Sequence, residues 1–425
     1  MNKEIKERIE TINKGKVPDG YIRTKAGLMP CDWIKSKPLT TNMIFENISD
    51  KNHGNEYPVL SATQEKGIVL RSEIEKDINF NKENTNSYKL VCKGDYVISL
   101  RSFQGGIEYS NIDGLVSPAY TVIRPIIPIS DGYYKEYFKT NDFIDRLNSA
   151  IYGIRDGKQI GYKDFAELAL HNPPLEEQEK IAEILSRCDK VIEECEKQVE
   201  EYKNLKKTCL SKMFPKKGSN VPEIRFPGFT DAWEQRKLGE LAVFNPKEEL
   251  PDVFEYVDLE SVVGTEMLAH RTEEKATAPS RAQRLAHTGD LFYQTVRPYQ
   301  KNNYLFEKPD KHYVFSTGYA QLRPFIDGYF LLSLVQNGQF VKTVLDDCTG
   351  TSYPAINAND LAEIEVFSPK DEQEHHQIGT YFRNLDNLIT LHQRKVNAYT
   401  QMKKALTQLL LTGIVRVNKQ QEISY

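Results

Sequence analysis

The chain reads EEQEKIAEILSRCDKVIEECEKQVEEYKNLKKTCLSKMF over residues 176–214, and this stretch is the key to its architecture. Apolar side chains recur in it at spacings of three and four, which predicts a long amphipathic helix. The same stripe returns 197 residues later, where Ile378, Tyr381 and Leu385 answer Ile181, Ile184 and Cys188. A repeat of this length indicates a duplicated pair of domains, because solenoid repeats run to roughly 20–50 residues.

Charged positions and upstream motifs repeat in the same order. In the helices, Asp189, Lys206 and Lys207 correspond to Asp386, Lys403 and Lys404 of the second copy. Upstream, Lys93-Gly94-Asp95 corresponds to Thr288-Gly289-Asp290, and Arg124-Pro125 corresponds to Arg323-Pro324. At the helix start, Glu177-Gln178 corresponds to Glu372-Gln373. The order of parts is therefore globular domain, helix, globular domain, helix.

Length and composition agree with a two-domain soluble protein. The 425 residues are 39% hydrophobic and 27% charged, which is ordinary for globular chains. No run approaches the roughly 18 apolar residues of a membrane span, and the charged start lacks the core of a signal peptide. The six cysteines form no Cys-x-x-Cys pair, so we expect reduced thiols and a cytoplasmic location.

Turn residues and composition shifts divide the chain into seven parts. We predict an N-terminal helical arm (1–17), a first domain (18–175), a central long helix (176–214), a linker (215–221), a second domain (222–370), a distal long helix (371–413) and a tail (414–425). Short β-type runs broken by Gly, Pro and Asn, such as Tyr96–Leu100, alternate with helical stretches inside the domains. The predicted fold class is α+β.

The two long helices need a partner for their apolar stripes, and the best partner is the other copy. Because a short linker carries the chain from the first helix into the second domain, we expect the helices to run antiparallel as a coiled-coil spacer with pseudo-twofold symmetry. The predicted interface comprises Ile181, Ile184, Cys188, Val191, Val199, Tyr202, Leu205, Ile378, Tyr381, Leu385, Leu388, Val396, Tyr399 and Met402. Two related heads on a rigid spacer would suit a two-part target such as duplex DNA, whose half-sites lie about 34–36 Å apart.

A family resemblance rests on three segments. Val221-Pro-Glu-Ile-Arg-Phe-Pro-Gly-Phe-Thr-Asp-Ala-Trp233 resembles the opening of a target-recognition domain in the specificity subunits of Type I restriction-modification systems, and Asp32-Trp33 resembles its first-copy counterpart. Pro174-Leu-Glu-Glu-Gln-Glu-Lys-Ile-Ala-Glu-Ile-Leu185 is similar to the opening of that family's central helix. The resemblance extends from about residue 18 to about residue 416, in the family's order of parts.

The resemblance implies a non-catalytic, sequence-specific DNA-binding subunit. Each of two target-recognition domains would read one half of an asymmetric bipartite site in double-stranded DNA. The helix pair would set the spacing and dock two methyltransferase subunits, which two restriction and translocation subunits join. Adenine methylation and cleavage, with S-adenosylmethionine, ATP and Mg²⁺, would then belong to the partner subunits, and we expect no cofactor or metal in this chain.

Candidate DNA contacts lie in two pairs of loops. The first pair follows strand-like runs and contains Arg101, Ser102 and Gln104 in one copy, and Arg297, Tyr299, Gln300 and Lys301 in the other. The second pair precedes each long helix and contains Arg155, Lys158 and Gln159, and Thr351, Ser352 and Tyr353. Arg and Gln can pair with purine edges in the major groove, and the hydroxyl, Lys and Arg groups can bind phosphate. The alternatives are salt bridges within the fold or ordinary surface turns, and for Arg124 and Arg323 a structural role is favoured.

Other functions find weaker support. Asn172-Pro-Pro-Leu175 lacks the aromatic residue of the amino-methyltransferase motif, and the nuclease-like set Asp252, Glu273 and Lys275 has no first-copy equivalent. A nucleotide-binding Gly-x-x-x-x-Gly-Lys-Ser/Thr loop does not occur. From a different class, a two-headed coiled-coil scaffold without sequence-specific DNA binding remains the alternative. Steeply salt-dependent, sequence-selective DNA binding would separate the two.

Overall fold

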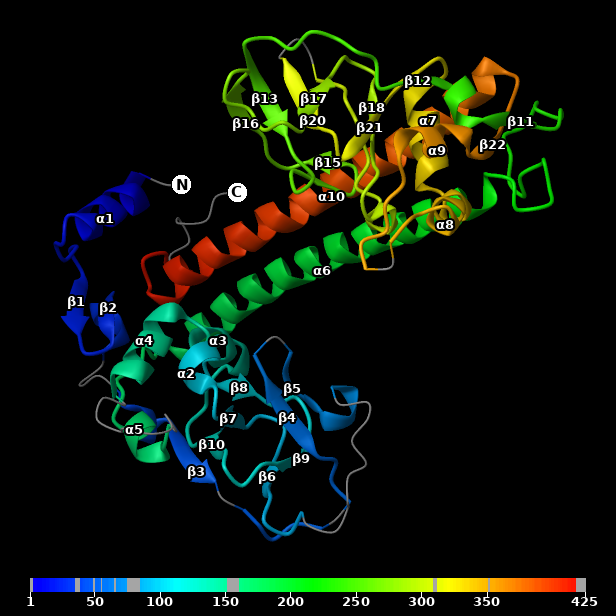
Figure 1. Ribbon diagram of the computed structural model, residues 1–425. Helices are drawn as coiled ribbons and strands as arrows, with labels where there is room; N and C mark the ends of the chain where they lie inside the picture. The colour runs from blue at the N-terminus through cyan, green and yellow to red at the C-terminus, as the bar shows by residue number, and fades with distance from the viewer. Residues whose placement is uncertain are drawn as a thin grey trace. The chain divides into compact units, whose positions relative to one another are not determined.

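The computed structural model describes residues 3–34, 39–48, 50–54, 56–64, 66–74, 85–150, 160–308, 312–350 and 352–417 (Figure 1). The chain forms two compact units. Unit 1 combines Met1–Glu193 with Val396–Tyr425, and unit 2 is Glu194–Lys395. Helices and strands mix in both units, which confirms the α+β class.

Unit 1 begins with a short helix and a hairpin and continues into the first domain. Its helices are α1 (Lys3–Asn13), α2 (Ser102–Gly105), α3 (Asp131–Tyr137), α4 (Asn141–Ala150) and α5 (Tyr162–Ala166), with 3₁₀ turns at Cys31–Trp33, Thr41–Met43 and Arg71–Glu73. Its strands are β1 (Tyr21–Thr24), β2 (Gly27–Pro30), β3 (Phe45–Ile48), β4 (Leu60–Thr63), β5 (Gly67–Leu70), β6 (Lys89–Val91), β7 (Tyr96–Ile98), β8 (Glu108–Tyr109), β9 (Gly114–Val116) and β10 (Thr121–Pro125).

Unit 2 holds the second domain. Its strands are β11 (Glu234–Lys237), β12 (Ala242–Phe244), β13 (Val253–Val257), β14 (Val262–Val263), β15 (Glu266–Met267), β16 (Arg271–Glu274), β17 (Ala282–Leu285), β18 (Leu291–Gln294), β19 (Tyr304–Leu305), β20 (Tyr313–Ser316), β21 (Tyr319–Pro324) and β22 (Glu365–Ser368). Its helices are α7 (Gly328–Gln336), α8 (Gly338–Asp346) and α9 (Ala358–Glu363), with 3₁₀ turns at Leu238–Glu240 and Pro298–Gln300. Helices α6 (Leu175–Lys212) and α10 (Glu372–Leu411) each contribute a part to both units.

The two units share one four-stranded sheet and differ in the second. A four-stranded antiparallel sheet has the order β3-β10-β7-β8 in unit 1 and β12-β21-β18-β19 in unit 2. Unit 2 has a second sheet, β16-β13-β20-β17, in which β13 and β20 run parallel. Unit 1 has the hairpin β4-β5 and the pair β6-β9, joined by a parallel bridge between Val59 and Leu115. The duplication inferred from the helices therefore extends to the strand order of both domains.

A helix lies between the first sheet and the long helices in each unit. In unit 2 the buried face of α7 packs with Leu291 and Leu322 of the sheet and with Ile378 and Phe382 of α10. α10 approaches α7 closely at Gly379, where an added Cβ would lie 2.1 Å from an Asp327 carboxylate oxygen. That oxygen caps α7 by accepting hydrogen bonds from the backbone of Tyr329 and Phe330, both at 2.9 Å. The cap explains why a glycine is needed inside this helix.

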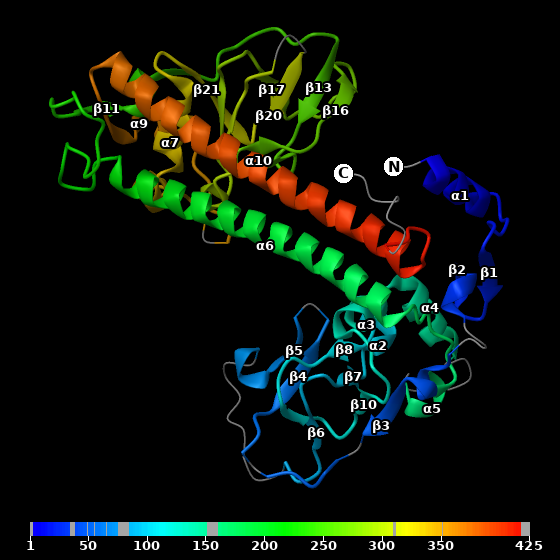
Figure 2. The ribbon, with the colours of Figure 1, turned by 180° about the vertical axis from the view of Figure 1, so that it is seen from behind.

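The long helices run antiparallel within each unit (Figures 1 and 2). In unit 2 the Nζ of Lys206 lies 2.5 Å from an Asp386 carboxylate oxygen. In unit 1 the Nζ of Lys403 lies 2.7 Å from an Asp189 oxygen. These four residues are the ones that the repeat matched at a spacing of 197, so each conserved lysine pairs with the conserved aspartate of the opposite helix. The predicted long antiparallel helices are confirmed.

A buried glutamate near the start of each long helix anchors the opening of its domain. In unit 1 Glu177 accepts hydrogen bonds from Trp33 Nε1 at 2.9 Å and from the Arg416 guanidinium at 2.8 and 2.9 Å. In unit 2 Glu374 accepts from Trp233 Nε1 at 3.3 Å and from the Arg225 guanidinium at 2.6 and 2.8 Å. We call each of these groups a glutamate clamp.

The clamps correct one detail of the repeat. Glu177 corresponds to Glu374, and not to Glu372 as the sequence pattern had indicated. The two helices also begin 197 residues apart, at Leu175 and Glu372. The two helices therefore align at a spacing of 197 residues from their first turn onward. The pairs Glu177-Gln178 and Glu372-Gln373 lie 195 residues apart and do not occupy equivalent positions.

The predicted helix stripe divides into buried and exposed positions. Ile181, Val199, Ile378, Leu385 and Val396 are buried, and Ile184, Cys188, Tyr202, Tyr381, Leu388 and Tyr399 are partly buried. Val191, Leu205 and Met402 differ from the expectation, with exposed fractions of 43%, 43% and 52%. Spacings of three and four drift around a straight helix over many turns, so a stripe read from sequence leaves the buried face at some positions. Among the described residues, no helix is long and apolar enough to cross a membrane.

Candidate nucleic-acid interface

In both units an arginine-aspartate pair lies at the start of the strand that leads to the first candidate loop, at the end of the strand away from that loop. The Arg124 Nε and Nη2 atoms donate to Asp95 at 2.6 and 2.8 Å, and Arg323 donates to Asp290 at 2.8 and 3.0 Å. Both aspartates are about 1% exposed, and hydrogen bonding to them raises the pKa of both arginines. The prediction that Arg124 and Arg323 are structural is confirmed.

In unit 1 the candidate loop follows β7. Arg101 and Gln104 are exposed, and Gln104 Oε1 accepts a long hydrogen bond of 3.5 Å from Gln64. Ser102 is 1% exposed, and its Oγ accepts from the backbone N–H of Ser99 at 2.9 Å. Ser102 therefore shapes the turn and does not present its hydroxyl to a ligand, whereas Arg101 and Gln104 can reach one.

In unit 2 the equivalent loop follows β18 and has an unusual backbone. Arg297 and Lys301 adopt left-handed conformations, with φ of 55° and 57°, on either side of the turn Pro298–Gln300. Few residues other than glycine adopt this conformation, so it marks a constrained loop. Tyr299 is 49% exposed, and Gln300 is exposed but accepts a hydrogen bond from Gln294 at 2.9 Å.

Lys301 is engaged inside unit 2. Its Nζ donates to the Gln336 carbonyl at 2.8 Å, and Gln336 Nε2 donates back to the Lys301 carbonyl at 3.0 Å. Burial, followed by the charge of Lys206, lowers the pKa of Lys301. Lys301 therefore links the loop to α7, and its role as a DNA contact stays a prediction.

The two candidate loops of unit 2 meet at a cation-π contact. The Arg297 guanidinium carbon lies 4.3 Å from the centre of the Tyr353 ring. The backbone N–H of Arg297 donates to the Pro354 carbonyl at 2.7 Å, and Val296 forms a β-bridge with Ala355. Tyr353 is 65% exposed and Ser352 is exposed, so a cation, an aromatic ring and a hydroxyl gather on one exposed surface. Four of the predicted candidates, Arg155, Lys158, Gln159 and Thr351, lie outside the described residues.

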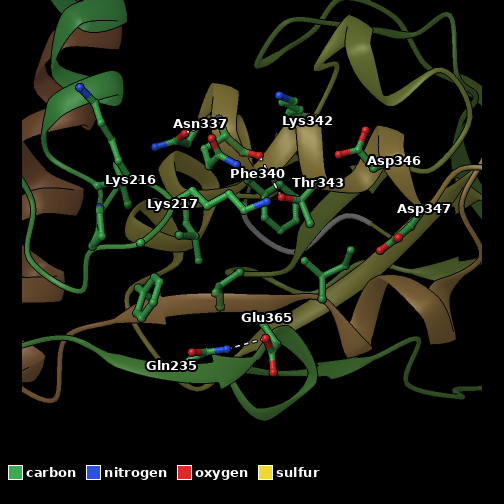
Figure 3. Close-up of a pocket in the computed structure, with 18 of the residues that line it drawn as sticks. Lys216, Lys217, Gln235, Asn337, Phe340, Lys342, Thr343, Asp346, Asp347 and Glu365 are labelled. Atoms are coloured by element: carbon green, nitrogen blue, oxygen red, sulfur yellow. Dashed lines mark hydrogen bonds between the residues drawn. The ribbon is translucent and has the colours of Figure 1, made fainter.

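Unit 2 also contains larger hollows away from these loops. One of them has a volume of about 820 Å³ and is lined by residues of the 214–218 turn, α8 and β22. Figure 3 shows Lys217 reaching into it toward Thr343, with Asp346 and Asp347 on the opposite side. Cations and carboxylates are mixed in this hollow, so it has no single charge character.

The enzyme-like motifs have structural partners. Asn172 Oδ1 accepts hydrogen bonds from Tyr134 and from Gln178, both at 2.9 Å, so its amide is held within the fold. Glu273 accepts from Arg271 at 2.7 Å, and Lys275 lies 3.3 Å from Glu249. Across the described part of the chain, no group of three or more His, Cys, Asp or Glu side chains could hold a metal ion.

Comparisons with known proteins agree with the geometry. Residues 37–201 match the family model of the Type I restriction modification DNA specificity domain. Two relatives come from Methanocaldococcus jannaschii. The Type I restriction enzyme MjaVIII specificity subunit is 24% identical over 78% of this chain and 82% of its own length, and the putative type I restriction enzyme MjaX specificity subunit is 24% identical over 94% and 97%. This chain resembles Type I specificity subunits over most of its length.

Solved structures of the family share the fold. The S subunit of a Type I restriction-modification system from M. genitalium has a TM-score of 0.51 at 14% identity, with 88% of this chain and 95% of that chain covered. A chain from a study of complex assembly and conformational transition of the Type I R-M system has a TM-score of 0.50 at 17% identity, with 94% and 100% covered. The family model matches only the first copy, whereas the similarity to the relatives also covers the second copy.

One residue near the candidate loops of unit 2 is absent from the predicted contacts. Arg284 on β17 lines a hollow beside Thr295, Val296 and Thr349. Nothing in the repeat pointed to it, because the matched motifs stop short of β17. The strand itself, Ala-Gln-Arg-Leu, does not alternate between polar and apolar residues and has a register shift between Ala282 and Arg284, so it gives no local signal.

Proposed function

We propose that this chain is the sequence-specific DNA-binding subunit of a Type I restriction-modification complex. The domain of each unit reads one half of an asymmetric bipartite site in double-stranded DNA. The helix pair sets the gap between the halves and docks two methyltransferase subunits, and restriction and translocation subunits join them. Adenine methylation and cleavage, with S-adenosylmethionine, ATP and Mg²⁺, belong to those partners.

The contrast between a duplicated scaffold and unlike loops carries the proposal. The arginine-aspartate pairs, the lysine-aspartate pairs and the glutamate clamps recur in both units. The loops held by that scaffold differ: one reads Arg101-Ser-Phe-Gln-Gly-Gly106 and the other reads Arg297-Pro-Tyr-Gln-Lys-Asn302. Two domains that share one scaffold but carry different candidate DNA-contacting residues suit a target with two different halves.

Local charge supports contact with DNA although the net charge of the chain is −4. Arg101 is exposed, and Arg297 rests on an exposed tyrosine ring. Within the described residues, neither guanidinium forms an ion pair with a carboxylate. An arginine fork without an acidic partner can donate two hydrogen bonds to guanine O6 and N7.

The helix pair has the length that a spacer needs. At about 1.5 Å per residue, a helix of 38 residues extends roughly 57 Å. Half-sites one helical turn apart lie about 34–36 Å from centre to centre, which is well within this length. The exposed apolar side chains Val191, Leu205 and Met402 add surface that a docked methyltransferase subunit could cover.

The test is to co-express the chain with its methyltransferase subunit and to map methylated adenines across a host genome by single-molecule sequencing. We expect a single gapped motif with unlike halves. Replacing residues 222–370 with the corresponding domain of a relative should change one half and leave the other intact. An assembled complex that adds no methylation, together with DNA binding that is neither sequence-selective nor steeply salt-dependent, would favour the scaffold alternative.

A further inference from the structure

A hollow in unit 2 adjoins the loops that meet at Arg297 and Tyr353. It has a volume of about 380 Å³ and is lined by Thr295 and Val296 on one side and by Thr349, Ala355 and Ile356 on the other. These segments are the ones that the bridges Val296 to Ala355 and Thr349 to Ala355 tie together. The hollow is therefore continuous with the candidate DNA surface of this unit.

Arg284 lines this hollow as a cation that forms no ion pair among the described residues. The side chain is partly buried, and its Nε atom is buried without a hydrogen-bond partner. Among the described residues no carboxylate forms an ion pair with Arg284, in contrast to Arg323, which pairs with both Asp290 and Glu248. Burial lowers the pKa of the guanidinium. Burial of the Arg284 Nε removes water from this donor, and no hydrogen bond replaces that water until a ligand supplies an acceptor.

The rest of the lining distinguishes between two possible ligands of DNA. Asp347 and Asp360 line the same hollow, together with Asn245 and Asn357. Carboxylates repel a phosphate but accept hydrogen bonds from the exocyclic amine of cytosine. The Asp360 carboxylate already accepts a hydrogen bond from the Asn357 amide, whereas the Asp347 side chain is exposed. A cation and a carboxylate in one hollow match the edge of a G·C pair better than the DNA backbone.

We propose that Arg284 reads a guanine in the half-site bound by unit 2, donating to guanine O6 and N7 while Asp347 accepts from the paired cytosine. The inference rests on the proposed DNA-binding function and adds a specificity-determining residue and its base to it. Arg284 then supplements Arg297, which stacks on Tyr353 in the adjoining loops.

The experiment uses the full chain assembled with its methyltransferase subunit. Arg284→Ala, Arg284→Lys and the control Arg281→Ala, an exposed arginine just before β17, are compared by genome-wide methylation mapping. With Arg284→Ala we expect one G·C position in the unit 2 half of the motif to become degenerate. Discrimination at that position should fall roughly 10- to 100-fold, as expected for the loss of a bidentate base contact. The other half of the motif and the control should not change.

Two results would overturn the inference. One is an unchanged motif in Arg284→Ala, and the other is a uniform loss of affinity at every site with a shallower salt dependence, which marks a phosphate contact. If Arg284→Ala does not assemble, Arg284→Lys decides, because it keeps the charge and the aliphatic stem but loses the fork, and it should show the same degeneracy. A wild-type complex without any gapped motif would instead contradict the proposed function itself.

Discussion

Glu177 and Glu374 each place a carboxylate where water is excluded. They are 0% and 1% exposed, yet each meets a tryptophan N–H and an arginine guanidinium. A buried charge is tolerable only when its partners satisfy it, and loss of one partner leaves the others unpaired. Because the partners come from distant parts of the chain, these two residues hold the domain openings against the long helices.

Replacing Glu177 with glutamine should destabilise unit 1. The variant keeps the size of the side chain but leaves the Arg416 charge without its buried partner, so we expect a loss of about 3 kcal/mol in the free energy of unfolding. Urea unfolding followed by circular dichroism measures it. The matched control is Glu176→Gln, next in sequence and exposed, whose ion pair with Lys180 is screened by solvent and should contribute little to stability. Equal losses in both variants would contradict the role of the clamp.

His171 should make unit 1 sensitive to mild acid. Its Nδ1 donates to the Leu411 carbonyl at 2.9 Å, while the buried Nε2 has no partner, so a second proton would be left unsatisfied. Burial lowers the pKa of His171 below its ordinary value of 6.5. The unfolded chain therefore binds more protons, and stability is present above about pH 6.5 and falls as the pH drops through that value.

The urea midpoint measured between pH 7.5 and pH 5.5 tests this expectation. His171→Gln should flatten the pH dependence of unit 1, although His375, whose pKa is also lowered by burial, will leave a contribution from unit 2. The exposed His376 provides the control, because His376→Gln should leave the profile as it is. A His171→Gln profile as steep as that of the wild type would exclude His171 as the source.

Arg297→Ala and Tyr353→Ala should each weaken DNA binding by the assembled complex roughly 10-fold, because each removes one partner of the exposed stack. Fluorescence anisotropy with a duplex that carries the mapped motif measures the effect. Lys275→Ala, a change at an exposed lysine on the edge of the second sheet, serves as the control. Unchanged affinity in both loop variants would remove this surface from the proposed interface.

At the scale of the elements, the lysine-aspartate pairs fix the register of the long helices. Lys206 and Asp386 are only 19% and 14% exposed, and Tyr329 also donates to Asp386 at 3.1 Å. Lys206→Glu should therefore cost roughly 2 kcal/mol of stability. Adding Asp386→Lys restores the opposite charges and should recover part of the loss, which a double-mutant cycle would measure. No recovery would mean that the pair is not coupled.

The helical elements were predictable because their signal is local and long. The stripes predicted helices over 176–214 and 371–413, and the structure has Leu175–Lys212 and Glu372–Leu411. The second sheet of each domain was not predictable, because its parallel pairing joins β13 to β20 across more than fifty residues and no local pattern records it. The candidate contact residues in the loops were only partly predictable. The repeat placed Arg297 correctly in a loop, but only the structure shows that Lys301 hydrogen-bonds to Gln336 while the Arg297 guanidinium lies over the Tyr353 ring.

At the scale of the whole molecule, unit 1 depends on the end of the chain. Tyr21 donates to the Gly413 carbonyl at 2.6 Å, Arg8 donates to the Ile414 carbonyl, and Arg416 bridges Asp32 and Glu177. A chain that ends at Leu411 loses all these contacts. We expect faster amide hydrogen exchange in residues 3–34 of that variant, with the sheets of unit 2 unchanged. A chain that ends at Val417 keeps the contacts and should exchange like the wild type, and equal exchange in the two variants would count against the end contacts.

Unit 2 occupies one continuous stretch, Glu194–Lys395, whereas unit 1 requires Val396–Tyr425 as well as the first 193 residues. During synthesis on the ribosome, everything that unit 2 needs has been made before unit 1 can close. The contact between Arg8 and Ile414 spans 406 positions, so it forms only after residue 414 has been made. Domains generally complete folding from the N-terminus onward as they emerge. In this protein the order is reversed: the half that is translated first finishes folding last, and until then part of its apolar surface stays uncovered.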